Sequence, residues 1–438
     1  MSSVFPRGKD LPVAVSTAGC FVEDAVGNRY LDAAGGAIVS AVGHGRTEIV
    51  DAIAAQLRRV DFVHSVSFRT EAVERYASEL AAVVPMEGAR VYPVAGGSEA
   101  TETALKLARA VQLARGEEHR VTLLSRDGSY HGNSLGALDV SGRRRLRAPY
   151  QPWLGRSVQL PVVNEYRCPN PHHPRACGRW HAQRLEEEIV RRGDVAAFIA
   201  ESVGGATVGV AVPPDDYWPA VAEVCRRHGV LLIVDEVMAG FGRTGRWFGI
   251  DHWGVSPDIM VCGKGAASGY WPLGLCIASG AIYEEVAVTG FVHGFTFSHH
   301  GAGAAAGLEV LRIMREEGLV EAARHQGGKL LAGLVAALDH PHIGDIRGIG
   351  LLLGVEFVAD RMSKEPFPPG ERITDRVMAS ARSQGLLTYA GRGAATGDSG
   401  DAVLLGPPLN ISDEEVDLIV ERLAAAVRAV FPPTPGSG

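Results

Sequence analysis

The chain has 438 residues, of which 46% are hydrophobic and 21% charged, and its formal net charge is −7 at pH 7. This acidic balance leaves no electrostatic footprint for nucleic acid, no apolar run is long enough to span a bilayer, and residues 1–7 lack the apolar core of a signal peptide. The composition is that of an ordinary globular protein of two or three domains.

The cysteines are scattered along the chain rather than set at regular spacings. They are Cys20, Cys168, Cys177, Cys225, Cys262 and Cys276. Two of them fall in predicted buried strands. We therefore expect reduced thiols and a cytoplasmic protein.

The first part of the chain predicts short strands and turns, with a hairpin over residues 24–31. A helix follows over 46–59, where apolar residues recur at helical spacing. From about residue 91 to 261, strands and helices alternate. This alternation indicates an α/β domain with a mostly parallel sheet.

The last third of the chain has a different pattern. A helix of small residues at 301–314 precedes predicted helices over 319–338, 372–384 and 412–430 and a strand over 350–357. These elements indicate a smaller α+β domain. Two segments are expected to be irregular: a glycine-rich loop at 390–401 and a disordered tail from 431 to 438.

Three short apolar runs each end at a polar residue that can carry chemistry. They stop at Glu201, at Asp235 and at Lys264. Such runs are typical of strands buried on both faces, and their separations suit strand–helix–strand units. Because ligands bind at the carboxyl ends of parallel strands, we expect a carboxylate and an amine to face one crevice. The pair suits pyridoxal phosphate, which needs a lysine for a Schiff base and an aspartate for its pyridinium nitrogen.

Each of these residues also has a structural interpretation. Asp235 is equally placed to cap a helix, and most lysines are exposed on loops. The position of Lys264 between two glycines, directly after a buried strand, argues against the exposed loop.

A helix beginning at Gly97 and Ser98 is a candidate phosphate site. It is predicted to run to about Arg115, with acids early and bases later. Glycine followed by serine at a helix start leaves backbone N–H groups free for an anion. A plain serine cap on a structural helix is the alternative.

An aromatic ring and a branched side chain are candidates for holding a planar cofactor. Tyr130 follows a predicted strand and can stack on a heteroaromatic ring, while Val237 is placed to cover the opposite face. A partly buried loop tyrosine is the alternative for Tyr130.

With these residues in place, the chain resembles the class III pyridoxal-phosphate-dependent aminotransferases of the ω-amino acid or amine:pyruvate type. The resemblance runs from residue 21 to about 423, and the order and spacing of its motifs are specific. The matching segments are Gly97-Ser98-Glu99-Ala100, Ser129-Tyr130-His131-Gly132, Ala200-Glu201, Asp235-Glu236-Val237, Gly240-Phe241-Gly242-Arg243-Thr244-Gly245, Lys264-Gly265, Gly294-Phe295-Thr296-Phe297 and Pro407-Pro408-Leu409.

The resemblance implies fold type I. It predicts a large cofactor-binding domain over 61–315 with a mostly parallel seven-stranded sheet, and a small α+β domain built from both termini, 1–60 and 316–430. It also implies an obligate homodimer with active sites shared between subunits, acting on small-molecule amines and keto acids.

The same resemblance implies roles for individual residues. Lys264 would form the Schiff base and move the proton, and Asp235 would keep the ring nitrogen protonated. The other expected cofactor contacts are Gly97 and Ser98 at the phosphate, Tyr130 and Val237 on the ring faces, His131 and Glu201 lining the site, and Thr296 on the phosphate held by the partner subunit.

The substrate residues are less well defined. Relatives that use α-carboxylates often carry an arginine shortly before the Pro407-Pro408 motif, where Gly397 aligns in this chain. Arg392, in the same glycine-rich segment, is the nearest candidate for a carboxylate contact. Trp153 is a second candidate substrate contact.

Two motifs compete with this interpretation. Cys168, His172, His173, Cys177 and His181 have spacings that zinc sites use. A similar Tyr-Arg-Cys-Pro loop occurs in relatives, so an irregular surface loop without metal is expected. The Gly348-Ile349-Gly350 segment resembles a dinucleotide fingerprint but precedes a strand, so the Rossmann interpretation fails on context.

The expected activity is transfer of an amino group from an amine or ω-amino acid to a keto acid or aldehyde such as pyruvate, by a ping-pong mechanism. An aminomutase, a decarboxylase or an epimerase on the same cofactor site is the nearest alternative. A cofactor-binding protein without turnover and an NAD-dependent enzyme are further alternatives. The Lys264–Asp235 pair argues against both.

Overall fold

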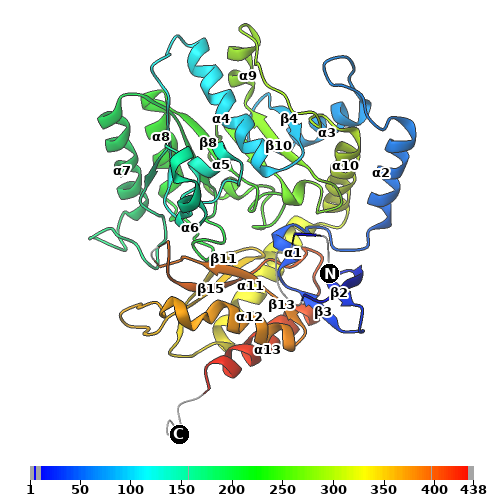
Figure 1. The fold of residues 1–438 in the computed structure, drawn as a ribbon, viewed down its shortest axis with the longest axis vertical. Helices are drawn as coiled ribbons and strands as arrows, with labels where there is room; N and C mark the ends of the chain where they lie inside the picture. The colour runs from blue at the N-terminus through cyan, green and yellow to red at the C-terminus, as the bar shows by residue number, and fades with distance from the viewer. Residues whose placement is uncertain (1–3, 6–10, 156, 396, 433–438) are drawn as a thin grey trace.

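The computed structural model describes residues 4–5, 11–155, 157–395 and 397–432. Two sheet-containing parts are stacked in Figure 1, a large one above and a smaller one below. Within the described ranges, no helix is both long enough and apolar enough to cross a membrane.

The large part is built on the predicted mostly parallel seven-stranded sheet, which is confirmed. Only β10 runs antiparallel to its neighbours, β4 and β9. The strands lie in the order β4 (Arg90–Val94), β10 (Gly274–Ala278), β9 (Ile259–Cys262), β8 (Leu231–Asp235), β7 (Val195–Glu201), β5 (Thr122–Arg126) and β6 (Ser157–Leu160).

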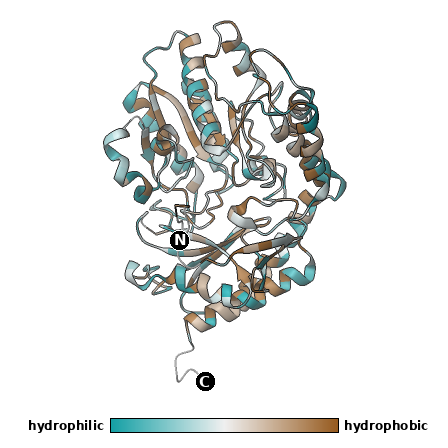
Figure 2. Cartoon of the chain, turned by 45° about the vertical axis from the view of Figure 1, so that its right-hand side comes forward, coloured by the Kyte–Doolittle hydropathy of each residue, from teal (hydrophilic) through white to brown (hydrophobic). Residues whose placement is uncertain are grey.

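The central strands are buried because helices cover both faces of the sheet. Every residue of β7, β8 and β9 is buried, as expected for continuous apolar runs in a parallel sheet. The covering helices include α4 (Gly97–Ala114), which packs on β9 and β10, and the paired α7 (Cys177–Arg192) and α8 (Tyr217–His228). Figure 2 shows the strands mainly brown and the outer faces of the helices teal.

The small part combines both ends of the chain, as predicted. Its main antiparallel sheet has the order β11 (Ile343–Ile349), β12 (Leu352–Phe357), β15 (Asp401–Leu405), β14 (Tyr389–Arg392). The helices α11 (Leu319–Ala337) and α12 (Ile373–Ser383) pack against it, and α13 (Asp413–Val430) packs on both of these helices. A second sheet joins the N-terminal β1 (Ala14–Ala18), β2 (Phe21–Asp24) and β3 (Arg29–Asp32) to β13 (Leu386–Leu387).

The predicted helices are confirmed to within a few residues, but two predictions in the small part are wrong in detail. The strand β11 was not predicted, because its glycines and charged residues do not give a strand pattern. Its extended conformation is stabilised by antiparallel pairing with β12. The predicted loop at 390–401 is shorter, since residues 389–392 form β14 and Asp401 begins β15. Of the predicted tail, residues 433–438 lie outside the described residues. The domain boundaries after residues 60 and 315 stay predictions.

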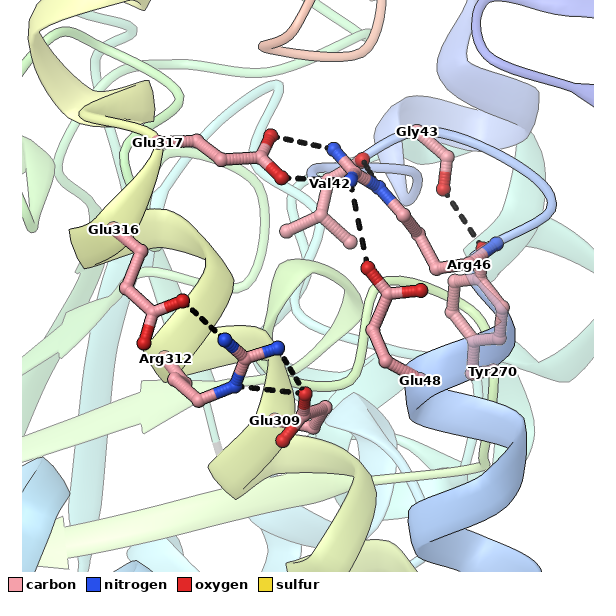
Figure 3. Close-up of polar contacts among 9 residues, drawn as sticks. All are labelled: Val42, Gly43, Arg46, Glu48, Tyr270, Glu309, Arg312, Glu316 and Glu317. Carbon is pink, nitrogen blue, oxygen red and sulfur yellow. Dashed lines mark hydrogen bonds and ion pairs between the residues drawn. The ribbon is translucent and has the colours of Figure 1, made fainter.

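One arginine links distant helices (Figure 3). Arg46 precedes α2 (Thr47–Arg59), and its guanidinium donates to both carboxylate oxygens of Glu317, just after α10 (Gly301–Glu316), at 2.7 and 2.6 Å. The backbone N–H of Arg46 donates to the Tyr270 hydroxyl, which in turn donates to the carbonyl of Gly43. The segment that follows Lys264 is thereby tied to the N-terminal region.

Candidate active site

A cavity of about 420 Å³ opens at the carboxyl ends of β7 and β8, beside Lys264, which lies two residues after β9. It brings together most of the residues that the sequence predicted for a cofactor site. They are Gly97, Ser98, Tyr130, His131, Glu201, Asp235, Val237 and Lys264. Parallel pairing places Glu201 directly opposite Asp235, so two acidic side chains enter the cavity at the same level of the sheet.

Asp235 is buried and held on both carboxylate oxygens. Oδ1 accepts from the backbone N–H of Val237 at 2.9 Å, and Oδ2 lies 2.7 Å from Nδ1 of His131. The other ring nitrogen of His131, Nε2, is buried and has no hydrogen-bond partner among the described residues. Because buried polar atoms are normally paired, this free nitrogen marks a place where a bound polar group fits.

Glu201 is the second buried carboxyl group of the cavity. Its Oε1 accepts from the backbone N–H of Gly205 at 3.1 Å. Burial raises the pKa of Glu201 above its ordinary value, His131 opposes this shift, and the nearby Asp235 adds to it. Glu201 is therefore ionised more readily when a cation lies in the same cavity, and is protonated more readily when none does.

Lys264 carries the only side-chain amine among the residues that line the described cavity. Its backbone has a φ of 45°, in the left-handed region that costs free energy for a residue with a Cβ. Burial lowers the pKa of the Lys264 ammonium, while the carboxylates of Asp235 and Glu201 raise it. The amine is thus more easily deprotonated than an exposed lysine, which suits a nucleophile or a base.

The start of α4 lines one end of the cavity with Gly97 and Ser98 and is a candidate anion-binding site. The residue before the helix, Gly96, has no side chain to cap it, and no side chain caps the helix. The first N–H groups of a helix have no partner within it, and the helix dipole there favours negative charge. Ser98 is not the cap that the structural alternative required, because its Oγ accepts from the backbone N–H of Asn133 at 3.1 Å.

Glycines keep the cavity walls close. A Cβ at Gly97 would lie 3.2 Å from both γ-methyl groups of Val237. Gly132 has a φ of +136°, and a Cβ there would lie 2.6 Å from Oγ of Ser98. The loop that carries Tyr130 and His131 can therefore approach α4 only with glycine at this position.

One functional candidate was missed in the sequence. Arg143 lines the cavity together with Tyr130 and Tyr389, and also lines a neighbouring polar cavity. It pairs with no carboxylate among the residues that the structure describes, and burial lowers its pKa. The signal in the sequence is a run of arginines, Arg143-Arg144-Arg145 with Arg147, in which nothing local distinguishes the member that faces the cavity.

Three predicted site residues lie outside the cavity. Arg392 lines the neighbouring polar cavity and forms an ion pair with Asp375. Trp153 ends the 3₁₀ helix η1 (Ala148–Trp153) and is 71% exposed. Thr296 is exposed on the loop before α10. In a single chain, none of these three side chains contributes to the lining of the cavity.

A larger cavity of about 740 Å³ lies between α3 (Glu71–Ala81), β4 and α9 (Gly280–Ala287). Its lining is mainly apolar and contains neither Lys264 nor Asp235. Size alone therefore does not identify the site, whereas the converging amine and carboxylates do.

Comparisons with known proteins agree with this geometry. The family described as "Aminotransferase class-III" matches residues 5–427. The putrescine–pyruvate aminotransferase of Pseudomonas aeruginosa is 33% identical, covering 96% of this chain and 93% of that protein. The taurine–pyruvate aminotransferase of Rhodobacter capsulatus is 36% identical, covering 96% and 92%. An (S)-enantioselective omega-transaminase from Thermomicrobium roseum superposes with a TM-score of 0.92 at 38% identity, covering 98% of this chain and 97% of that one.

Proposed function

The chain belongs to the class III aminotransferases and depends on pyridoxal phosphate, and from this premise we propose that the cavity around Lys264 and Asp235 is its active site, where an amino group passes from an amine donor to pyruvate. The observation that carries the proposal is the convergence of a partly buried amine, a buried and doubly held aspartate and an uncapped helix start on one cavity.

The residues present fit the cofactor. The N-terminal turn of α4 suits a phosphate, and Val237 beside Gly97 gives a smooth wall on which a flat ring can lie. Tyr130 is the candidate for the opposite wall. When bound, pyridoxal phosphate supplies a conjugated cationic ring that accepts the electron pair left behind by a departing proton.

Asp235 and Lys264 have distinct roles in this proposal. The carboxylate of Asp235 would stabilise a proton on the ring nitrogen of the bound cofactor, and its two hydrogen-bond partners hold the carboxylate in one orientation. Nζ of Lys264 removes the proton from the substrate carbon and returns it elsewhere, which the lowered pKa of this amine favours. Glu201 and His131 complete the polar wall.

Arg143 is the proposed contact for the carboxylate of a keto acid. It is the arginine that lines the cavity, and it forms no ion pair with a carboxylate of the described residues, although Asp375, Asp398 and Asp401 line the neighbouring polar cavity that it also borders. A guanidinium can bind a carboxylate through two parallel hydrogen bonds. The relatives from Pseudomonas aeruginosa and Rhodobacter capsulatus are both named as aminotransferases that use pyruvate, which supports pyruvate as the amino acceptor of this chain. Arg392 is the alternative, and its ion pair with Asp375 would have to break first.

The homodimer is part of the same proposal. Thr296 is exposed beside Phe297, which is 61% exposed and lies edge-on to Phe62 at 6.2 Å. Val66 and Phe68 are exposed in the segment that carries Phe62. A second copy of the chain covering this apolar patch would bring Thr296 to a phosphate in the partner's cavity.

The cytoplasm is the expected location. In the described chain all six cysteines are free, and five of them are buried. Reduced thiols are typical of that compartment.

Separate half reactions test the activity. Mixing the holoenzyme with an amine alone should convert the cofactor to its amino form, with a change in its absorbance. Pyruvate added afterwards should restore the first spectrum and yield alanine. An alternative chemistry, such as decarboxylation or racemisation, would release product without this spectral cycle. Lys264→Ala should bind cofactor but not complete the cycle.

A further inference from the structure

A cluster of sulfur and imidazole groups lies outside the active site, where the loop after β6 enters α7. Sγ of Cys168, Nδ1 of His173 and Sγ of Cys177 all lie within 4.8 Å of one another. His173 Nδ1 is 3.1 Å from the Cys177 sulfur. Nε2 of His181 lies 4.0 Å from the Cys168 sulfur. His181 is one turn after Cys177 on α7, so both side chains lie on the same side of the helix.

The loop is folded to bring these groups together. Asn170 is buried, and its side-chain amide donates to the carbonyl of Arg175 and to the sulfur of Cys177. Its side-chain oxygen accepts from the backbone N–H of His172. The start of α7 is fixed separately, because Asp216 accepts from the backbone N–H groups of Gly178 and Arg179.

From this geometry we propose that Cys168, His173, Cys177 and His181 form a structural zinc site. Two thiolates and two imidazoles are a ligand set that zinc prefers. Tetrahedral bonds of about 2.0–2.3 Å place ligand atoms roughly 3.3–3.8 Å apart. Cys168, His173 and Cys177 are already within 4.8 Å of one another, and the side chain of His181, which approaches Cys168, would have to move inward to complete the set. The two thiol protons pass to solvent on binding. This proposal departs from the sequence expectation of a loop without metal.

The histidines decide between zinc and a disulfide. A Cys168–Cys177 disulfide would need no imidazole, yet two imidazole nitrogens lie next to the thiols. His181 is buried, and its other nitrogen, Nδ1, has no partner in the described part of the chain. A metal bond would replace the long contact between Nε2 and the Cys168 sulfur, while Nδ1 would stay without a partner among the described residues.

The position of the cluster indicates what the metal would do. Arg167, next to Cys168, donates to the buried carboxylate of Glu356 on β12 at 2.6 Å and to the carbonyl of Lys364. Zinc would therefore fix a loop that joins α7 of the large part to the small part. Four protein ligands leave no open position, so the role is stability rather than catalysis.

Metal analysis of the dialysed holoenzyme tests the proposal, after equilibration with zinc sulfate. We expect one zinc per chain in the wild type and in His172→Ala, an exposed neighbour outside the cluster. Cys177→Ser and His181→Ala should lose it. A wild type without stoichiometric zinc, or a Cys177→Ser variant that keeps it, would overturn the site.

The wild type gives a second measurement that does not depend on how the variants fold. Chelation should lower the melting temperature of the wild type, and zinc should restore it. Replacement by Co²⁺ should give the long-wavelength bands of a tetrahedral thiolate site, beyond the absorbance of the cofactor. Absence of these bands, an unchanged melting temperature, or an intact mass lighter by the two thiol hydrogens would each contradict the proposal.

Discussion

At the scale of single residues, the proposed chemistry depends on how side chains are held. Asp235 has a fixed partner on each oxygen, whereas Nε2 of His131 has none among the described residues. Lys264 combines a strained backbone with a depressed pKa. Strain at a position where burial also tunes ionisation is typical of a functional residue.

Asp235→Asn should keep the fold and lose most of the activity. The amide can retain the hydrogen bond to the Val237 N–H but carries no charge to stabilise a protonated ring nitrogen. We expect kcat to fall by at least ~10²-fold, the scale of losing a well-placed electrostatic group. Circular dichroism and bound-cofactor absorbance control for folding. A loss of less than about tenfold would mean that Asp235 is mainly structural.

Arg143→Ala should weaken the keto acid half reaction specifically. We expect the apparent KM for pyruvate to rise about 10–100-fold, the scale of a charge-assisted hydrogen-bonded pair, with little change in the amine half reaction. Arg144→Ala is the matched control, because Arg144 is exposed and pairs with Asp127. If Arg392→Ala raises the KM while Arg143→Ala does not, the carboxylate contact is Arg392.

At the level of secondary-structure elements, the loops that follow the strands position the residues of the site. One of these loops contains a buried carboxyl group, Glu236, whose ionisation would make stability depend on pH. Glu236 follows Asp235 and is fully buried, with its carboxyl oxygens accepting from the N–H groups of Gly249 and Ile250. Burial raises the pKa of Glu236 to about 8, and these hydrogen bonds oppose the shift.

Glu236→Gln should flatten the dependence of stability on pH. A carboxyl group whose folded pKa is raised contributes stability that is complete below its unfolded pKa of about 4.5 and is lost as the pH rises through about 8. Wild-type melting temperatures, compared between pH 5 and 9, should fall more steeply than those of the variant. Parallel curves would show that Glu236 does not titrate in this range.

Arg46→Ala should loosen the joint between α2 and α10. The variant loses a bidentate, partly buried ion pair, which we expect to lower the free energy of unfolding by roughly 1–2 kcal/mol. Arg312→Ala is the control, since its partners Glu309 and Glu316 lie on the same exposed helix face (Figure 3). Thermal unfolding of both variants measures the difference, and equal effects would contradict a special role for Arg46.

At the scale of the whole molecule, the cavity of one chain lacks some of the predicted contacts. Thr296 lies on the surface beside exposed apolar residues, so its predicted role requires a second subunit. This dependence gives the dimer proposal a direct functional test.

Mixing two inactive variants should restore activity. A Lys264→Ala subunit lacks the amine but offers Thr296, while a Thr296→Ala subunit offers the amine, so a heterodimer holds one intact site. We expect activity to reappear after subunit exchange, and sedimentation should show a dimer. Tight cofactor binding by Thr296→Ala alone, or an active monomer, would rule out the shared site.

The fold class and the core of the candidate site could be predicted from the sequence alone. Buried strands read as continuous apolar runs, and a parallel sheet collects their carboxyl ends, so Glu201, Asp235 and Lys264 converge as predicted. Three features became visible only in the folded molecule: which arginine lines the cavity, that β11 is a strand, and that cysteine and histidine side chains of the loop before α7 lie close to those at its start. These outcomes depend on contacts between distant segments and on ion pairs such as Arg392–Asp375, which local periodicity and spacing do not encode.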